Sequence, residues 1–144
     1  MKETDIAYLA GIIDGEGCIS MYQISNGHGK SVMCGLWIAN TDKNLMDWLV
    51  ENLGGSLNTR TSKKPQWKTS WVWAVYSQNM EDVLIRVLPY LKVKHTQAEL
   101  ALRARELMKR SGKNGKGYNQ EIANGYNSIV TEFKGLNQRG VALN

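Results

Sequence analysis

The stretch LAGIIDGEG, residues 9–17, constrains the fold of this chain more than any other. Apolar residues recur there at helical spacing, which predicts a short helix over 5–14 with Thr4 or Asp5 as its N-cap. Gly15 and Gly17 are expected to end this helix. One of its faces is bulky and suits a core: Ile6, Leu9, Ala10 and Ile13. Another face is nearly flat and suits a second backbone at close range: Ala7, Ala10, Gly11 and Asp14.

Two carboxylates, Asp14 and Glu16, stand at the C-terminal end of this helix, where the helix dipole is negative. A negative charge at that end costs a few tenths to about 1 kcal/mol. A divalent cation would offset this cost, because Mg²⁺ takes oxygen ligands and is commonly held by one or two carboxylates together with substrate phosphates. The alternative is that both acids are solvated residues of a turn.

The rest of the chain alternates hairpins with helices. Strand patterns cover 18–25, 31–40, 55–62 and 68–77, and the first two flank a glycine-bearing turn. Helical patterns cover 41–54, 78–91 with a break near Pro89, 93–112 and 118–136. This order, αββαββα with an appended helix, predicts an α+β fold with one four-stranded antiparallel sheet. Residues 1–112 would form the core, and residues 113–144 a helical extension of the same domain.

Composition narrows the class of protein. The chain has 144 residues, of which 42% are hydrophobic, as expected for one domain with its own core. A net charge of +5 suits a partner that carries phosphates, although an ordinary basic domain would share it. Cys18 and Cys34 form no zinc-binding pattern and are interpreted as small buried residues of a cytoplasmic protein. No stretch is long and apolar enough for a membrane span, and the start lacks a signal peptide.

Two basic loops resemble phosphate-binding loops only superficially. NGHGKS (26–31) has Ile24 where such a loop needs its first glycine, and GKNGKG (112–117) has no serine or threonine after its lysines. No nucleotide cofactor is therefore expected.

The opening stretch resembles the signature helix of the LAGLIDADG homing endonucleases. It matches at six positions, Ile12 and Glu16 are conservative exchanges, and Gly15 replaces an alanine. The identical positions are Leu9, Ala10, Gly11, Ile13, Asp14 and Gly17. Two further stretches, ANTDKNLMDWL (39–49) and LPYLKVKHTQAELA (88–101), resemble the family in the same order, and the end FKGLNQRG (133–140) resembles bacterial members.

The resemblance implies a Mg²⁺-dependent endonuclease of a mobile element, encoded by a bacterium, a phage or an organelle. It would hydrolyse one phosphodiester in each strand of a long, near-palindromic double-stranded DNA site. Because the motif occurs once, the resemblance implies a homodimer, which would bring two Glu16 side chains together near a two-fold axis. The family implies that Mn²⁺ can replace Mg²⁺ and that Ca²⁺ supports binding without cleavage. An RNA-binding intron maturase and a non-cleaving DNA-binding protein remain alternatives on the same fold.

The resemblance also assigns roles to individual residues. Glu16 would be the principal metal ligand, with the Gly15 carbonyl and, second in rank, Asp14. Asn40 would position water or, alternatively, cap the helix that follows it. Lys94 would stabilise the charge of the transition state, its alternative being a solvated lysine. The implied catalytic residues are thus Glu16, Asn40 and Lys94, and the implied dimer contacts are Ala7, Ala10, Gly11 and Asp14.

A sheet of this kind would read DNA in the major groove, with alternate residues of each strand facing the bases. The positions that follow Glu16 set the alternation, although the run Trp71–Val72–Trp73 leaves the fourth strand open to the opposite assignment. Arg60 is the most plausible reader of a guanine. The expected DNA-facing strand residues are Ser20, Tyr22, Ile24, Ser31, Met33, Trp37, Asn58, Arg60, Ser62, Ser70 and Val72. The expected phosphate contacts are Lys30, Lys63, Lys64, Lys68 and Lys116.

Overall fold

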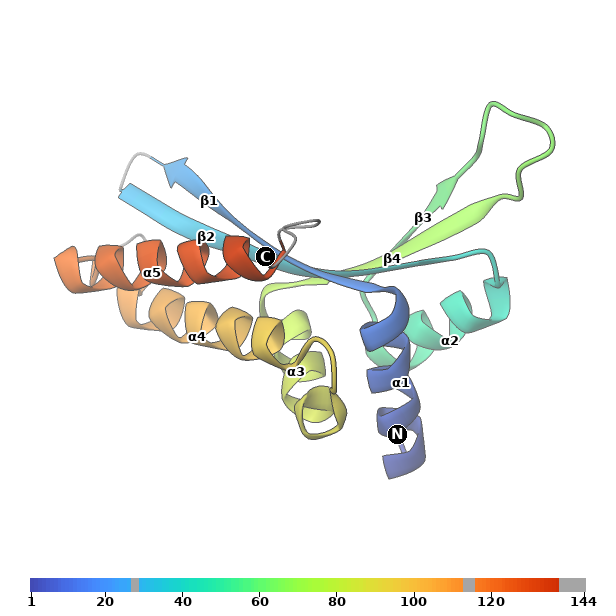
Figure 1. Ribbon diagram of the computed structural model, residues 1–144, viewed down its shortest axis with the longest axis horizontal. Helices are drawn as coiled ribbons and strands as arrows, with labels where there is room; N and C mark the ends of the chain where they lie inside the picture. The colour runs from blue at the N-terminus through green and yellow to red at the C-terminus, as the bar shows by residue number, and fades with distance from the viewer. Residues whose placement is uncertain (27–28, 113–115, 138–144) are drawn as a thin grey trace, which may run out of the picture.

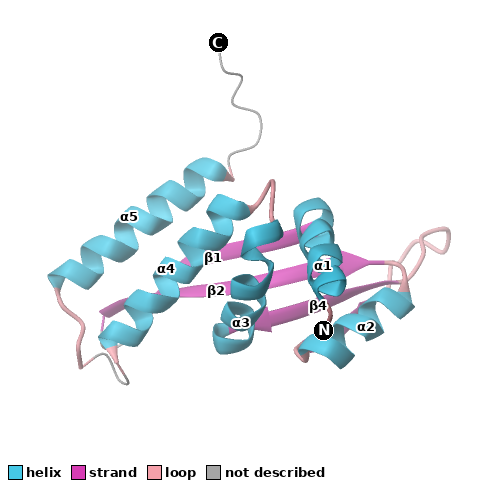
Figure 2. Ribbon diagram, turned by 90° about the horizontal axis from the view of Figure 1, so that it is seen from below, coloured by secondary structure: helices cyan, strands magenta, loops and turns pink. Residues whose placement is uncertain are grey.

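A computed structural model describes residues 1–26, 29–112 and 116–137. Within these residues, a four-stranded antiparallel sheet carries the helices on one side and leaves its other side open (Figures 1 and 2). In Figure 1 the two hairpins rise on either side of the middle of the sheet, so the open side is hollowed like a saddle. The expected α+β class and the four-stranded antiparallel sheet are confirmed.

The elements follow the expected order. The helices are α1 (Glu3–Glu16), α2 (Lys43–Leu53), α3 (Ser77–Val87), the 3-10 turn η1 (Leu88–Tyr90), α4 (His95–Ser111) and α5 (Gln120–Leu136). The strands are β1 (Gly17–Asn26), β2 (Gly29–Asn40), β3 (Ser56–Arg60) and β4 (Ser70–Tyr76). The break between α3 and η1 falls beside Pro89, as predicted, because proline cannot continue the hydrogen bonding of a helix.

The strand order is β1-β2-β4-β3, so each hairpin contributes one central and one edge strand. Cys18 pairs with Trp37, and Trp37 in turn pairs with Ala74 of β4. Arg60 of β3 pairs with Ser70. Because paired residues share a face of the sheet, this register defines which side chains point to the helices and which to the open side.

The core lies between the helices and the covered face of the sheet. Ile19, Leu36, Ile38 and Trp73 point into it from the strands and are almost fully buried. Burial of side chains of this size stabilises the fold by roughly 1.5–3 kcal/mol each. The helices contribute Leu9, Ile13, Met46, Leu49, Met80, Leu84, Leu100, Ile122, Tyr126 and Phe133.

The helix α1 differs from the expectation at both ends. It runs from Glu3 to Glu16, with Lys2 as its N-cap, so the prediction of Thr4 or Asp5 as the cap was wrong. The backbone N–H of Lys2 donates to the carboxylate of Asp5 over 2.9 Å, which stabilises this first turn. At the other end the helix passes through Gly15, and only Gly17 stops it.

Gly17 is where the helix becomes a strand, with no intervening loop. A Cβ atom at this position would lie 2.7 Å from the carbonyl oxygen of Ile13, a contact that real side chains do not make. Only glycine therefore permits α1 and β1 to join directly, and this joint places Glu16 at the edge of the sheet.

Ionic contacts also tie helices together. Glu81 of α3 is buried and accepts from Lys109 Nζ at 2.5 Å and from Arg105 Nε at 3.3 Å, both on α4. A buried carboxylate with two cationic partners fixes the packing of the two helices more than it adds stability. Among the described residues no helix has the length and apolar character needed to cross a membrane.

Candidate functional site

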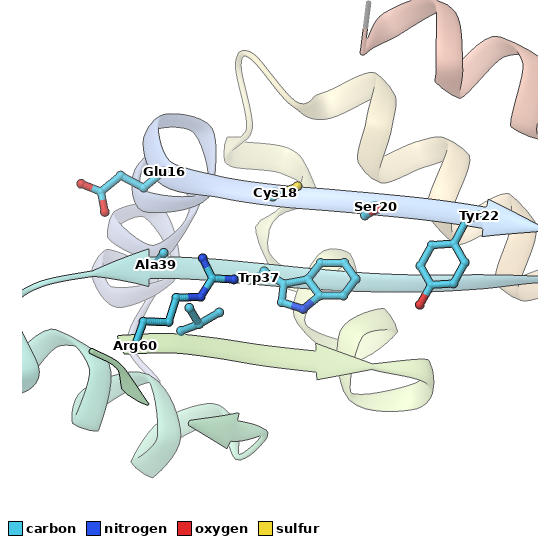
Figure 3. A pocket seen from close by; sticks show the side chains of 8 residues that line it. Glu16, Cys18, Ser20, Tyr22, Trp37, Ala39 and Arg60 are labelled. Carbon is cyan, nitrogen blue, oxygen red and sulfur yellow. The ribbon is translucent and has the colours of Figure 1, made fainter. Parts of the chain in front are cut away.

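Glu16 stands where three hollows of the surface meet. One is the open face of the sheet, one lies between α1 and the start of α2, and one lies beside the start of α4. Glu16 itself is exposed and ends α1, so its carboxylate is accessible from all three. Figure 3 shows the carboxylate at the end of the open face, projecting away from it beside the first residues of β1.

Asn40, the last residue of β2, fixes this carboxylate. Its side-chain N–H donates to Glu16 Oε2 over 2.5 Å, and its side-chain oxygen accepts from the backbone N–H of Asp42 at 2.8 Å. Asp42 is the N-cap of α2 and accepts from the backbone N–H of Leu45. Asp42 is thus the residue that caps α2, and Asn40 links that cap to Glu16.

Asp14 turns to a different partner, the segment just before α4. Its two carboxylate oxygens accept from the backbone N–H groups of Lys92 at 2.7 Å and Lys94 at 2.9 Å. Burial raises the pKa of Asp14, but the hydrogen bonds from this segment outweigh it and hold the pKa below its usual value. Both oxygens thus accept hydrogen bonds within the protein, which ties Asp14 to this segment, and its roles as a second metal ligand and a dimer contact stay predictions.

Lys94 lies against the end of α1. Its ammonium group donates to the backbone oxygen of Asp14 over 2.5 Å, where the helix dipole is negative. The same hollow is lined by Gly15, Glu16 and Gln97. The structure therefore brings together Glu16, Gly15, Asn40 and Lys94, which come from three different parts of the sequence.

The donor set around Glu16 limits what kind of metal site is possible. In the described part of the chain, no three His, Cys, Asp or Glu side chains are grouped so that they could hold a metal ion. One carboxylate and the backbone oxygen of Gly15 suit a hard cation that keeps water and takes further oxygens from a phosphate, as Mg²⁺ does. The same set does not suit zinc, which needs several nitrogen or sulfur ligands.

The open face of the sheet carries the side chains expected there. Ser20, Tyr22 and Ile24 of β1 share it with Met33 and Trp37 of β2, as the pairing register requires. Asn58, Arg60, Ser70 and Val72 of β3 and β4 lie on the same side. The alternation derived from the position of Glu16 is therefore the observed one, and Trp73 points into the core as expected.

Some of the residues expected to contact DNA lie outside the strands, and the side chains of others are not described. Val72 belongs to the open face but is only 7% exposed, because neighbouring side chains cover it. Ser62, Lys63, Lys64 and Lys68 lie in the segment that joins β3 to β4, and Lys116 follows α4. Lys30 and Ser31 belong to β2 by their backbone, and their side chains lie outside the described part.

The sequence interpretation missed several residues of this face. Cys18, Ala39 and Tyr76 share it, and Cys18 is exposed, so the expectation that both cysteines are buried holds only for Cys34. The signal was present in the sequence, since Cys18 precedes Ser20 by two positions and so shares its face. The sequence interpretation instead took Cys18 for a small, buried, apolar residue.

The exposed face of α1 also differs from the expected one. Ala7, Gly11 and Gly15 are exposed, and a Cβ atom at either glycine would meet nothing within 4 Å. Tyr8 stands beside them, 57% exposed, with its ring against Trp48 of α2 at 5.8 Å. Ala10 is fully buried in the core of its own chain, so its expected place in a dimer contact was wrong.

The same fold occurs in solved structures of homing endonucleases. I-CvuI, solved in complex with its target in the presence of Ca, has a TM-score of 0.75 and 20% sequence identity, over 97% of this chain and 85% of that one. I-Vdi141I, an archaeal intron-encoded homing endonuclease complexed with DNA, has a TM-score of 0.72 and 16% identity, over 100% of this chain and 91% of that one.

A third such structure is longer. The LAGLIDADG homing endonuclease I-LtrWI, bound to target DNA, has a TM-score of 0.67 and 21% identity, and the match covers 92% of this chain but 43% of that one. No family model and no curated protein matches the sequence. At these identities the likeness shows the fold, which is that of the LAGLIDADG homing endonucleases and confirms the fold implied by residues 9–17.

Proposed function

We propose that the chain is a site-specific DNA endonuclease that acts as a homodimer and hydrolyses one phosphodiester in each strand of double-stranded DNA. The observation that carries the proposal is the position of Glu16. It is the exposed end of α1, it is held by Asn40 at 2.5 Å, and it opens onto the saddle-shaped face of the sheet. A carboxylate at the end of an open sheet face would lie close to a phosphate of a duplex bound on that face.

A divalent cation fits this position. The Glu16 carboxylate and the Gly15 backbone oxygen would hold it, with the remaining ligands from phosphates and water. When bound, Mg²⁺ would neutralise charge on the phosphate and lower the pKa of a bound water. We expect Mn²⁺ to substitute for it and Ca²⁺ to support binding without cleavage.

The side chains around Glu16 supply orientation and charge. Asn40 holds the carboxylate in one position, because its own amide is fixed by Asp42. Lys94 brings a positive charge to the same end of α1, where it would stabilise the negative charge that develops on the phosphate. Asp14 positions Lys94 through the backbone of the segment before α4.

The exposed face of α1 supports a homodimer. Ala7, Gly11 and Gly15 lie at intervals of four residues, so they form one flat stripe along the helix. Two copies packed through this stripe around a two-fold axis would place their Glu16 side chains close together and double the open sheet. The match to less than half of I-LtrWI agrees with a chain that supplies half of a larger arrangement.

Charge supports a DNA partner. A dimer would carry a formal charge of +10, twice the +5 of one chain. Lys63, Lys64 and Lys68 are exposed in the segment between β3 and β4, at one end of the open face, where they would meet phosphates. Affinity for DNA should therefore fall steeply with added salt.

The test works without a known target sequence. A double-stranded DNA library with a randomised segment is incubated with the protein in Mg²⁺ and, separately, in Ca²⁺, and cut and bound molecules are sequenced. We expect cleavage of one related set of sequences in Mg²⁺, and binding of the same set without cleavage in Ca²⁺.

The Glu16→Gln variant is the matched control, because it keeps the shape and the hydrogen bond to Asn40 but loses the charge. It should bind the same sequences and cut none. Cleavage by this variant would remove Glu16 from its role. Binding without cleavage by the wild type would indicate a non-cleaving DNA-binding protein, and preferential binding of a structured intron RNA would indicate a maturase.

A further inference from the structure

The open face of the sheet carries little charge for a surface that would read DNA. Among the described strand residues on this face, Arg60 is the only charged side chain. Apart from the amide of Asn58, the others are small, apolar or aromatic, and we call Tyr22, Met33, Trp37 and Tyr76 the aromatic cluster. Tyr22, Met33 and Tyr76 are at least one-third exposed.

Trp37 is fixed in place by its neighbours. Its indole N–H donates to the hydroxyl of Tyr76 at 3.1 Å, and the two rings meet edge to face with centroids 5.3 Å apart. The ring also lies over Gly35, where a Cβ atom would come within 2.4 Å of it. The single hydrogen-bond donor of Trp37 is thereby used inside the protein, so the ring offers only apolar surface to a partner.

The neighbouring aromatic residue is engaged in the same way. The hydroxyl of Tyr22 donates to the sulfur of Met33 at 2.8 Å, across the hairpin of β1 and β2. Its proton is therefore directed along the face and away from a bound molecule. The donors of both large aromatic residues of β1 and β2 are therefore engaged within the protein.

In the major groove one base offers an apolar group, the C5 methyl of thymine. We infer that the aromatic cluster selects thymines by contact with their methyl groups, and that Arg60 selects one guanine. This inference rests on the proposed function. Figure 3 shows the Arg60 guanidinium pointing across the groove toward β2, where it lies beside Ala39 and Trp37 and can reach the O6 and N7 atoms of a guanine.

The half-site is therefore a run of A·T pairs, with thymine methyls against the cluster, next to one G·C pair. Along the open face, Arg60 lies at one end, where it pairs with Ser70. Tyr22 and Met33, which pair with each other, lie toward the other end. Trp37 stands between them, level with Ala74. A homodimer would read this order twice, in opposite directions from the centre.

The first experiment selects bound sequences from the randomised library in Ca²⁺. The wild-type protein should enrich thymines at several positions and one guanine in each half-site. The Arg60→Met variant should lose the guanine, with a preference that falls about tenfold or more, and keep the thymines. The Met33→Ser variant should lose preference at a thymine and keep the guanine.

The second experiment removes the methyl group from the DNA. Each selected thymine is replaced by deoxyuridine, which pairs in the same way, and binding of the wild-type protein is measured. We expect affinity to fall about fourfold for each methyl that contacts the cluster. Gly35→Ala, which forces the Trp37 ring to move, should abolish that fourfold difference, whereas Ile85→Ala on the helical side should keep it.

The outcomes separate the inference from the proposed function. Enrichment of G·C pairs at the positions that Met33→Ser changes, or equal binding of thymine and deoxyuridine sites, would overturn the inference while site-specific binding stands. Failure to enrich any DNA sequence would overturn the proposed function and the inference with it.

Discussion

Asn40 holds Glu16 by a hydrogen bond of 2.5 Å, and the backbone of Asp42 holds Asn40 in turn. The start of α2 thus sets the position of the carboxylate at the end of α1. Asn40 therefore contacts the site and the residue that caps α2, while the cap itself is Asp42.

The first prediction concerns this link. Asn40→Ala should lower the cleavage rate about 100-fold, because a carboxylate that moves by about 1 Å no longer fits its reaction geometry. Binding in Ca²⁺ should change little. Asp42→Ala is the control, since it removes the cap of α2 at a cost of about 1 kcal/mol in unfolding free energy and leaves Glu16 bound to Asn40. Equal losses of cleavage in both variants would contradict the role of Asn40.

The second prediction concerns Asp14. Asp14→Ala should lower the free energy of unfolding by about 2 kcal/mol, because two backbone N–H groups lose a charged acceptor. Urea unfolding in the presence of a chelator measures it without interference from metal. Asp5→Ala, at the other end of the same helix, removes one exposed bond and should cost less than half as much. A larger cost for Asp5 would show that the segment before α4 does not depend on Asp14.

The third prediction tests the flat stripe of α1. Gly11→Leu places a bulky side chain where the single chain has open space, so the monomer should remain as stable as the wild type or become slightly more stable. Sedimentation should show a monomer, whereas the wild type should sediment as a dimer at the same micromolar concentration. Gly135→Leu makes the same change in α5, also in open space, and should leave the dimer intact. A dimeric Gly11→Leu protein would move the interface elsewhere.

The fourth prediction concerns the joint between α1 and β1. Gly17→Ala should destabilise the protein by about 2 kcal/mol, because the new methyl group meets the backbone of Ile13 at 2.7 Å. Gly135→Ala, in α5 and away from the proposed interface, meets no atom within 4 Å and should be neutral or stabilising by up to about 1 kcal/mol. Thermal unfolding of the two variants provides the comparison, and similar melting temperatures would contradict the crowding at Gly17.

The fifth prediction separates the two cysteines. Burial raises the pKa of the Cys34 thiol to about 12, so Cys34 should resist alkylation at pH 8 in the folded protein. Cys18 is exposed on the open face beside Glu16 and should react. Mass spectrometry should find one label, and the labelled protein should lose DNA binding. Cys18→Ser should take no label under the same conditions and should still bind DNA after treatment.

The sequence predicts well what depends on local periodicity. The alternation of β1 follows from its start at Gly17, and it assigns Ser20 and Tyr22 to the open face as observed. The same reasoning identified the break at Pro89, because it depends on residues within one turn of each other.

Long-range relationships could not be predicted in this way. The partners of Asp14 lie 78 and 80 positions further along the chain, and no local pattern indicates them. Ala10 could not be placed either, since a small apolar residue fits a core and a flat stripe equally well. Its burial is decided by the elements that pack against that side of α1, which only the assembled fold specifies.

If the chain is the endonuclease proposed above, the joint at Gly17 has a consequence for how its target can change. Because Glu16 and the first residues of β1 belong to one uninterrupted stretch of backbone, no loop can lengthen or shorten between the proposed metal ligand and the proposed base contacts. The distance between the bases contacted by β1 and the bond that would be cut is then fixed by the backbone geometry. Substitutions on the strands would then change which bases are preferred, while the position of the cut relative to those bases would stay the same.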